Sequence, residues 1–232
     1  MHTPTTMEPP PPPHQPQPPI RVPPGRKLPH QYDNPLTSTL LDCMEFAYPT
    51  LVSMGVTATG LTLISGILQA GSIFLLWKGY YGFAAFSYIL GGMADEVDGW
   101  FARMSNSVSD VGDWLDHGKD LVVHIGLLAT IILLPGLPVP WKVAYVLIGA
   151  VLAVLSTMHL ACQEVLYDRP SEGVAITWVR DLGTCEYAPS SRRFHTAIRW
   201  LRFAGTGTVF VVIAIGMLSL RWLVRPPPGA TP

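Results

Sequence analysis

Long apolar runs separated by short charged stretches dominate this chain. No Asp, Glu, Lys or Arg occurs between Glu45 and Lys78, between Lys78 and Asp95, between Asp120 and Lys142, between Lys142 and Glu164, or between Arg202 and Arg221. Most of these gaps approach the ~20 residues that a helix needs to cross a bilayer. The runs are continuous rather than alternating, so they favour helices over the strands of a barrel. The alternative, core helices of a soluble protein, is disfavoured because one short chain cannot easily bury so many apolar runs.

The runs predict an all-α fold: a polytopic membrane helix bundle with five to six transmembrane helices plus an N-terminal interfacial helix. The interfacial helix is expected over Leu36–Pro49, where apolar residues recur at helical spacing. Spanning helices are expected at roughly 51–77, 80–104, 112–134, 141–163 and 203–223, the last continuing a helix that begins near Arg192. A sixth span would have to lie in the polar segment 173–190, and the sequence leaves that choice open.

Both ends of the chain differ in composition from this membrane domain, which we place at residues 36–224. Residues 1–35 contain 13 of the 23 prolines, so they are expected to form a disordered, proline-rich tail. Such a tail is either merely solvated or a docking segment for partner domains. Residues 225–232 are expected to form a flexible C-terminal tail.

Charge is scarce and is placed unevenly. The net charge is -1 and charged residues make up 13% of the chain, about half the usual share, which excludes nucleic-acid binding by phosphate neutralisation. Arg21, Arg26 and Lys27 precede the first span, and Arg103 and Lys119 lie in the second-to-third connection, opposite an uncharged turn. The positive-inside tendency therefore predicts an integral, multi-pass membrane protein with this charged connection facing the cytoplasm.

The cysteines indicate no site of their own. Cys43, Cys162 and Cys185 share no metal-ligand spacing. Three cysteines also predict no disulfide framework. We interpret them as small apolar or spacer residues.

The stretch Ala94–His124 carries the candidate chemistry. Two sets of residues each share one helix face: Asp95, Asp98, Gly99, Ala102 and Arg103, and then Gly112, Asp116 and Asp120. The four carboxylates lie at the ends of two adjacent membrane helices, so they can converge. They would repel one another unless cations neutralise them. Hard oxygen ligands suit Mg²⁺, Mn²⁺ or Ca²⁺, and a pair of such metals is a standard device for phosphoryl displacement.

These residues and their spacing resemble the full signature of the CDP-alcohol phosphotransferase (CDP-alcohol phosphatidyltransferase) family: Asp95-x-x-Asp98-Gly99-x-x-Ala102-Arg103, eight residues, Gly112, three residues, Asp116, three residues, Asp120. Eight fixed positions make a strong signal. The order of apolar segments extends the resemblance over roughly residues 40–224. The resemblance implies transfer of a phosphatidyl or phospho-alcohol group from a CDP-linked donor to an alcohol acceptor, with release of CMP. It also implies a membrane enzyme of phospholipid biosynthesis, and homodimers are common in the family.

The resemblance also assigns roles by position. Asp95 and Asp116 would bridge two divalent cations, Mg²⁺ or Mn²⁺. Asp98 would complete the first metal site and Asp120 the second, and Asp120 would act as general base on the alcohol. The CDP part of the donor would be held by Gly99, Ala102, Arg103 and Gly112.

Other residues have weaker claims. Thr59 stands where the family's first-helix motif usually has Asn, so Thr59 and Thr62 either contact the nucleotide or pack helices in the membrane. Lys119 is a candidate phosphate contact. Arg199 and Arg202 could bind an anionic acceptor or lipid phosphate, or form a basic flank on anionic lipids.

Alternatives stay open at this point. A cation transporter would also line a path with acids, but it predicts acids near mid-membrane and repeated broken helices. A catalytically inactive scaffold would have no use for an acid cluster, which is costly to bury. Within the family we favour CDP-diacylglycerol with a water-soluble alcohol, whereas Asp116-His117-Gly118 resembles the branch that joins CDP-choline or CDP-ethanolamine to diacylglycerol.

Overall fold

A computed structural model describes residues 22–167 and 191–224, and within these ranges the chain is helical with no strand. The all-α prediction is confirmed. The elements in chain order are α1 (Pro35–Ser53), α2 (Ala58–Trp77), α3 (Tyr81–Met104), α4 (Asp110–Leu133), α5 (Val139–Tyr167), α7 (Arg192–Leu201), the 3₁₀ turn η2 (Arg202–Ala204) and α8 (Thr206–Leu223). The segment 173–190, where a sixth span would have to lie, and most of the two tails lie outside the described residues.

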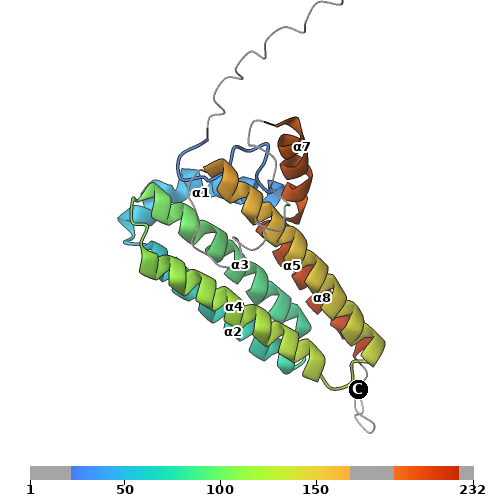
Figure 1. The fold of residues 1–232 in the computed structure, drawn as a ribbon. Helices are drawn as coiled ribbons and strands as arrows, with labels where there is room; N and C mark the ends of the chain where they lie inside the picture. The colour runs from blue at the N-terminus through green and yellow to red at the C-terminus, as the bar shows by residue number, and fades with distance from the viewer. Residues whose placement is uncertain (1–21, 168–190, 225–232) are drawn as a thin grey trace, which may run out of the picture.

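Helices α2, α3, α4, α5 and α8 run side by side as a bundle (Figure 1). Helices α1 and α7 lie at the same end of this bundle as the α3–α4 connection, and the C-terminal end of α8 lies at the opposite end. Helices α2 and α8 make the most extensive contacts with α3. Helix α3 is therefore the centre of the bundle, and it delivers its C-terminal acids to the end that α1 covers.

Capping side chains fix where several helices begin. The Asn34 side chain accepts hydrogen bonds from the first turn of α1, and Thr57, Ser109 and Ser191 do the same for α2, α4 and α7. The prediction that the first span begins at residue 51 is wrong, because α1 runs on to Ser53. A left-handed Gly55, at φ +74°, then turns the chain into the Thr57 cap.

Within residues 22–167 and 191–224, three helical stretches are long and apolar enough to cross a membrane by length and composition: Ala58–Trp77, Val139–Leu166 and Arg192–Leu223. Helices α3 and α4 have 24 residues each, and both carry the acidic residues of the motif at one end. Large apolar side chains are widely exposed on the bundle, among them Phe83, Leu121 and Val151. Exposed apolar surface on this scale is typical of a lipid-facing protein.

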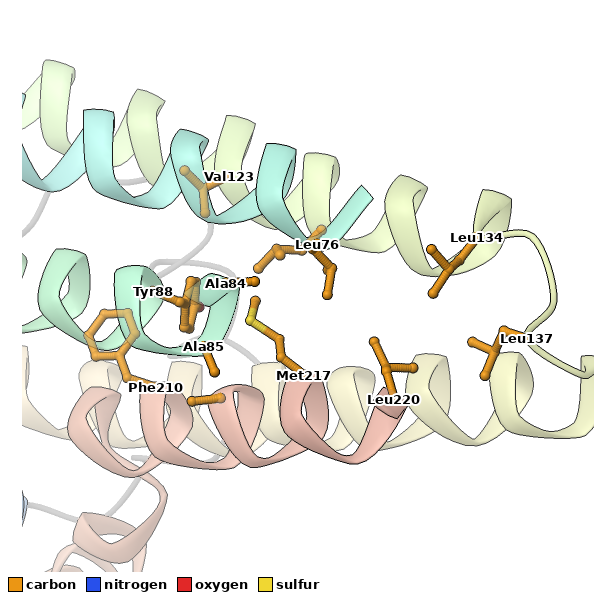
Figure 2. Close-up of a cluster of buried hydrophobic side chains, with 12 residues drawn as sticks. Leu76, Ala84, Ala85, Tyr88, Val123, Leu134, Leu137, Phe210, Met217 and Leu220 are labelled. Carbon is orange, nitrogen blue, oxygen red and sulfur yellow. The ribbon is translucent and has the colours of Figure 1, made fainter. Parts of the chain in front are cut away.

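The main apolar cluster lies in the half of the bundle away from α1 (Figure 2). It joins α2, α3, α4 and α8 through side chains such as Leu76, Tyr88, Phe210 and Met217. Close approach at this cluster depends on Gly92, since a Cβ there would lie 2.6 Å from the Phe210 ring. This packing fixes the position of α3 along the bundle axis, and therefore the position of its acidic residues.

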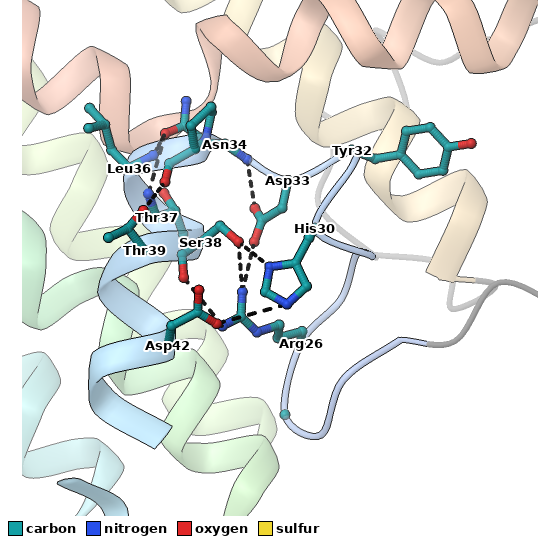
Figure 3. Close-up of polar contacts among 12 residues, drawn as sticks. Arg26, His30, Tyr32, Asp33, Asn34, Leu36, Thr37, Ser38, Thr39 and Asp42 are labelled. Carbon is teal, nitrogen blue, oxygen red and sulfur yellow. Dashed lines mark hydrogen bonds and ion pairs between the residues drawn. The ribbon is translucent and has the colours of Figure 1, made fainter. Parts of the chain in front are cut away.

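Residues 22–34 do not match the prediction of a disordered tail extending to residue 35. Leu28, Tyr32, Asn34 and Arg26 are buried, at 1–4% exposed. The Arg26 guanidinium binds Ser38, Asp33 and Asp42 beneath the segment (Figure 3). Prolines exclude regular structure here but not a packed loop, because an irregular segment can still bury its side chains when they find partners.

Leu28 and Tyr32 also join a second apolar cluster with α5 and α7. Its other buried members are Ala161, Cys162, Phe194 and Ile198. The interpretation of the cysteines as small apolar or spacer residues is wrong at Cys162, which is disulfide-bonded, whereas Cys43 is free and exposed. The segment before α1 is thus fastened to both α1 and α7.

Candidate active site

The ends of α3 and α4 bring three of the four predicted acids together. Asp95, Asp98 and Asp116 each offer one carboxylate oxygen, and these oxygens all lie within 4.8 Å of one another. Asp98 is the most enclosed, at 4% exposed. Asp120 is one turn after Asp116 on α4 and lies outside this group of three, with its side chain 39% exposed.

The Lys119 ammonium lies among these carboxylates. Its Nζ contacts Asp95 on α3, reaches Asp116 Oδ1 at 2.9 Å, and lies 3.4 Å from Asp120 Oδ1. The side chain is only 9% exposed. Among the described residues, the acid cluster is therefore neutralised in part by a cation that belongs to the chain itself.

Helix α2 forms the third wall. Ser65 Oγ donates to Asp95 at 3.3 Å and accepts from Lys119 Nζ at 3.2 Å. Gly66 leaves room for the Lys119 side chain, because a Cβ there would lie 3.4 Å from Lys119 Cγ. Of the two predicted threonines, Thr62 is buried and lies beside Asp98, whereas Thr59 is exposed on the first turn of α2. The structure brings Thr62, but not Thr59, into the acid site.

The four residues predicted to hold CDP lie in the last turns of α3 and the first turn of α4, on either side of the connection between these helices. On α3, a Cβ at Gly99 would lie 3.3 Å from Arg103 Nη1, so the glycine leaves this helix face open beside the guanidinium. Ala102 is half-buried one turn later. Gly112 lies in the first turn of α4, where its N–H donates to the capping Ser109. Arg103 itself donates from Nε to the carbonyl oxygen of Gly25 at 2.6 Å.

The predicted acceptor residues Arg199 and Arg202 contact the segment before α1. Arg202 Nη1 donates to the carbonyl oxygens of His30 and Gln31, and the Arg199 guanidinium lies over the Tyr32 ring. Gly205 and Gly207, which follow Arg202 in the chain, both face Asn34, since a Cβ added at either one would lie 2.9 or 2.8 Å from the Asn34 side chain.

One titratable group outside the helices is perturbed. Burial raises the pKa of Asp33 above its ordinary value, although the Asn34 N–H and Arg26 act in the opposite direction. This carboxyl lies under the segment before α1 and is bonded to the Asn34 N–H at 2.8 Å (Figure 3).

The acid cluster fits divalent metal ions. All of its donors are carboxylate oxygens, which Mg²⁺ and Mn²⁺ prefer. Asp98 Oδ2 is buried and has no hydrogen-bond partner among the described residues. A buried charged oxygen without a hydrogen-bond partner destabilises the fold unless a bound cation neutralises it. The position of the Lys119 ammonium further indicates that the site attracts positive charge.

Comparison with known proteins agrees with this geometry. A family model described as CDP-alcohol phosphatidyltransferase matches residues 55–225. The chain belongs to the CDP-alcohol phosphatidyltransferase family. This family transfers phosphate-containing groups in lipid synthesis and uses divalent metals, and the acid cluster described above could bind one. No curated protein and no solved structure matches the chain significantly.

Two residues at the site in this member of the CDP-alcohol phosphatidyltransferase family were not predicted. Ser65 had a detectable signal: the polar residues Thr62, Ser65, Gln69 and Ser72 follow helical spacing through an apolar run, and all four are buried. Gly25 had none. Its contact with Arg103 spans 78 residues and uses a backbone carbonyl, which no side-chain pattern can reveal.

Proposed function

We propose that this protein transfers a phosphatidyl or phospho-alcohol group from a CDP-linked donor to the hydroxyl of an alcohol, with release of CMP, at a site that opens to the cytoplasm. The convergence of Asp95, Asp98 and Asp116 from two helices carries this proposal. Divalent cations held by these acids, together with the nearby Arg103, would attract a diphosphate because they neutralise its negative charge.

The acids would hold two divalent cations, Mg²⁺ or Mn²⁺: Asp95 and Asp116 would contribute to both sites, Asp98 to one and Asp120 to the other. Bound there, the cations would neutralise the diphosphate and stabilise the leaving oxygen of CMP. Arg103 pairs with the donor phosphates, and Gly99, Ala102 and Gly112 let the nucleotide approach the two helices. Thr62 contacts Asp98 from α2, and Thr59 contacts the donor at the entrance to the site.

Asp120 acts as general base. Its partial exposure and its position outside the tight group of three support this role, because a base must reach the acceptor as well as the metal site. It takes the proton of the alcohol hydroxyl, whose oxygen attacks the phosphorus distal to cytidine. The bond from that phosphorus to the oxygen of CMP then breaks.

The lipid substrate enters from the bilayer. The exposed apolar side chains on the outside of the bundle support a multi-pass protein in contact with lipid. In this proposal α2, α3, α4, α5 and α8 are the membrane-spanning helices. Arg199 and Arg202 lie at the same end as the acids and are the candidate contacts for an anionic acceptor or lipid phosphate (Figure 1). We favour CDP-diacylglycerol as donor and a water-soluble alcohol as acceptor.

The test is a CMP-release assay on the purified protein in lipid nanodiscs. CDP-diacylglycerol with a panel of polar alcohols, and CDP-choline or CDP-ethanolamine with diacylglycerol, are compared with and without Mn²⁺ or Mg²⁺. We expect metal-dependent CMP release with one donor class. Asp116→Asn should reduce it by at least about a hundredfold, as for removal of one charged group that stabilises a transition state.

Asp110→Asn is the matched control, since Asp110 is an exposed acid on the first turn of the same helix. It should leave the rate within about twofold, because a surface acid at a helix start contributes only to helix stability. Metal flux across vesicles without any nucleotide requirement would instead favour a cation transporter. Absence of CMP release from every donor would refute the proposal.

A further inference from the structure

We infer that Lys119 is a built-in counter-cation of the acid cluster, which a divalent metal must displace from the carboxylates in order to bind. The inference rests on the proposed metal site and concerns how that site is filled. Its starting point is the position of Nζ, which lies within 4 Å of carboxylates from both helices: Asp95, Asp116 and Asp120.

The ammonium and the metals compete for the same oxygens. Asp95 Oδ1 and Asp116 Oδ1 both bond to Lys119 Nζ, and these two residues belong to the group whose oxygens converge within 4.8 Å. A carboxylate oxygen that accepts from an ammonium has less electron density to offer a cation. Two positive charges that share this small space also repel each other.

Contacts with neighbouring helices hold the Lys119 side chain in this position. Its stem lies against Gly66 of α2, where an added Cβ would be in van der Waals contact with Lys119 Cγ at 3.4 Å. Ser65 accepts a third hydrogen bond from Nζ. Two residues of α2, two acids of α4 and one acid of α3 therefore surround a side chain that is 9% exposed.

The contacts of Lys119 stabilise the metal-free protein. Four carboxylates at one end of a helix pair repel one another, and burial of unpaired charge is strongly destabilising. The ammonium offsets part of this repulsion while no metal is bound. It also lowers the apparent metal affinity, because each metal that enters must break charge-assisted contacts before it gains its own.

The experiment measures Mn²⁺ binding to the full-length protein in detergent, without nucleotide, by the loss of the free-ion signal in electron paramagnetic resonance. Lys119→Met removes the charge and keeps the length of the side chain. We expect it to bind Mn²⁺ about tenfold or more tightly, since a charged hydrogen bond is worth roughly that factor. Lys142→Met is the control, because Lys142 lies near the start of α5, where its Nζ bonds to the carbonyl oxygen of Ile132 and not to the acid cluster; its affinity should be unchanged.

Thermal unfolding separates this role from a purely structural one. Metal-free Lys119→Met should melt below the wild type, and Mn²⁺ should raise its Tm by more than it raises the wild-type Tm. A merely structural lysine would lower the Tm equally with and without metal, and this result would overturn the inference. Lys119→Gln, which keeps a polar contact to Ser65, replaces the methionine variant if that variant does not fold.

The outcomes also separate this inference from the proposed function. If the wild type binds Mn²⁺, Asp116→Asn abolishes binding and Lys119→Met binds with equal or weaker affinity, the metal site stands and the competition is refuted. If neither the wild type nor Lys119→Met binds Mn²⁺, the proposed metal site fails and the inference fails with it.

Discussion

Arg103 Nε donates to the carbonyl oxygen of Gly25, 2.6 Å away and 78 residues earlier in the chain. This hydrogen bond ties the arginine of the motif to the segment before α1. The segment is in turn held by the buried Arg26, whose guanidinium binds Ser38 and Asp42 of α1 (Figure 3). The orientation of Arg103 therefore depends on a part of the chain that lies outside the motif.

The contact at Gly25 predicts a specific effect of Gly25→Ala. Gly25 has φ +71°, and a Cβ there would lie 2.6 Å from Met104 Cγ and 2.9 Å from the Trp100 side chain. The methyl group should push the carbonyl away from Arg103, so the KM for the CDP-linked donor should rise several-fold. Gly55→Ala is the control: it has φ +74° but no atom within 4 Å of the added Cβ. Both variants should lose about 1–2 kcal/mol to backbone strain, but only Gly25→Ala should change the KM; equal KM values would contradict the contact.

Ser65→Ala tests the contribution of α2 to the acid site. Loss of the hydroxyl removes the donor that orients Asp95 and the acceptor that holds Lys119. The rate of CMP release at saturating Mn²⁺ should therefore fall roughly three- to tenfold, whereas half of the maximal rate should be reached at lower Mn²⁺, because Lys119 competes less. Ser72→Ala removes another buried hydroxyl of the same helix, one that donates to the carbonyl oxygen of Ala84 in the apolar half. It should lower the Tm without changing the metal dependence. A reversed pattern would show that α2 does not support the site.

Gly92→Ala tests the packing that positions α3. The added methyl group would overlap the Phe210 ring, and such overpacking costs about 1–3 kcal/mol. Thermal unfolding in detergent should show a lower Tm. Gly82→Ala, on the same helix with no atom within 4 Å of the added Cβ, should leave the Tm unchanged or raised, because alanine favours the helix. Equal losses in the two variants would show that α3 and α8 do not approach closely at Gly92.

Asp33 predicts a pH dependence of stability. Because burial raises its pKa, the folded state holds a proton on this carboxyl more tightly than the unfolded state does. Its stabilising contribution is complete below the ordinary pKa and is lost as the pH rises through the raised one. The free energy of unfolding of Asp33→Asn, relative to the wild type, should therefore increase with pH across that interval and level off above it. Unfolding at a series of pH values measures this difference, and a decrease over the same interval would contradict the burial of Asp33.

Helix positions and the acid site were predictable because each has a local signal. Apolar runs between charged residues placed α3, α4 and α8 within a few residues of their positions in the structure. The spacing of Asp95, Asp98 and Asp116 was enough to predict their convergence, because residues at i and i+3 or i+4 share a helix face.

What the sequence did not predict depends on contacts between distant segments. Residues 22–34 look like a tail by composition, yet Arg26 and Leu28 are buried against α1 and α7. The position of Lys119 among the acids depends on how closely α4 approaches Gly66 of α2, which is a property of helix packing rather than of spacing. Proline content and charge patterns describe a segment alone and carry no information on such partners.

The central claim is that acids from α3 and α4 share divalent metals. Anomalous diffraction from crystals of the protein grown with Mn²⁺ tests it most directly, since manganese scatters anomalously and magnesium and sodium do so only weakly. We predict two anomalous peaks, one beside Asp98 and one beside Asp120, with Asp95 and Asp116 between them. Diffraction data that show no peak among these four side chains at saturating Mn²⁺, or manganese bound only elsewhere on the chain, would contradict the claim.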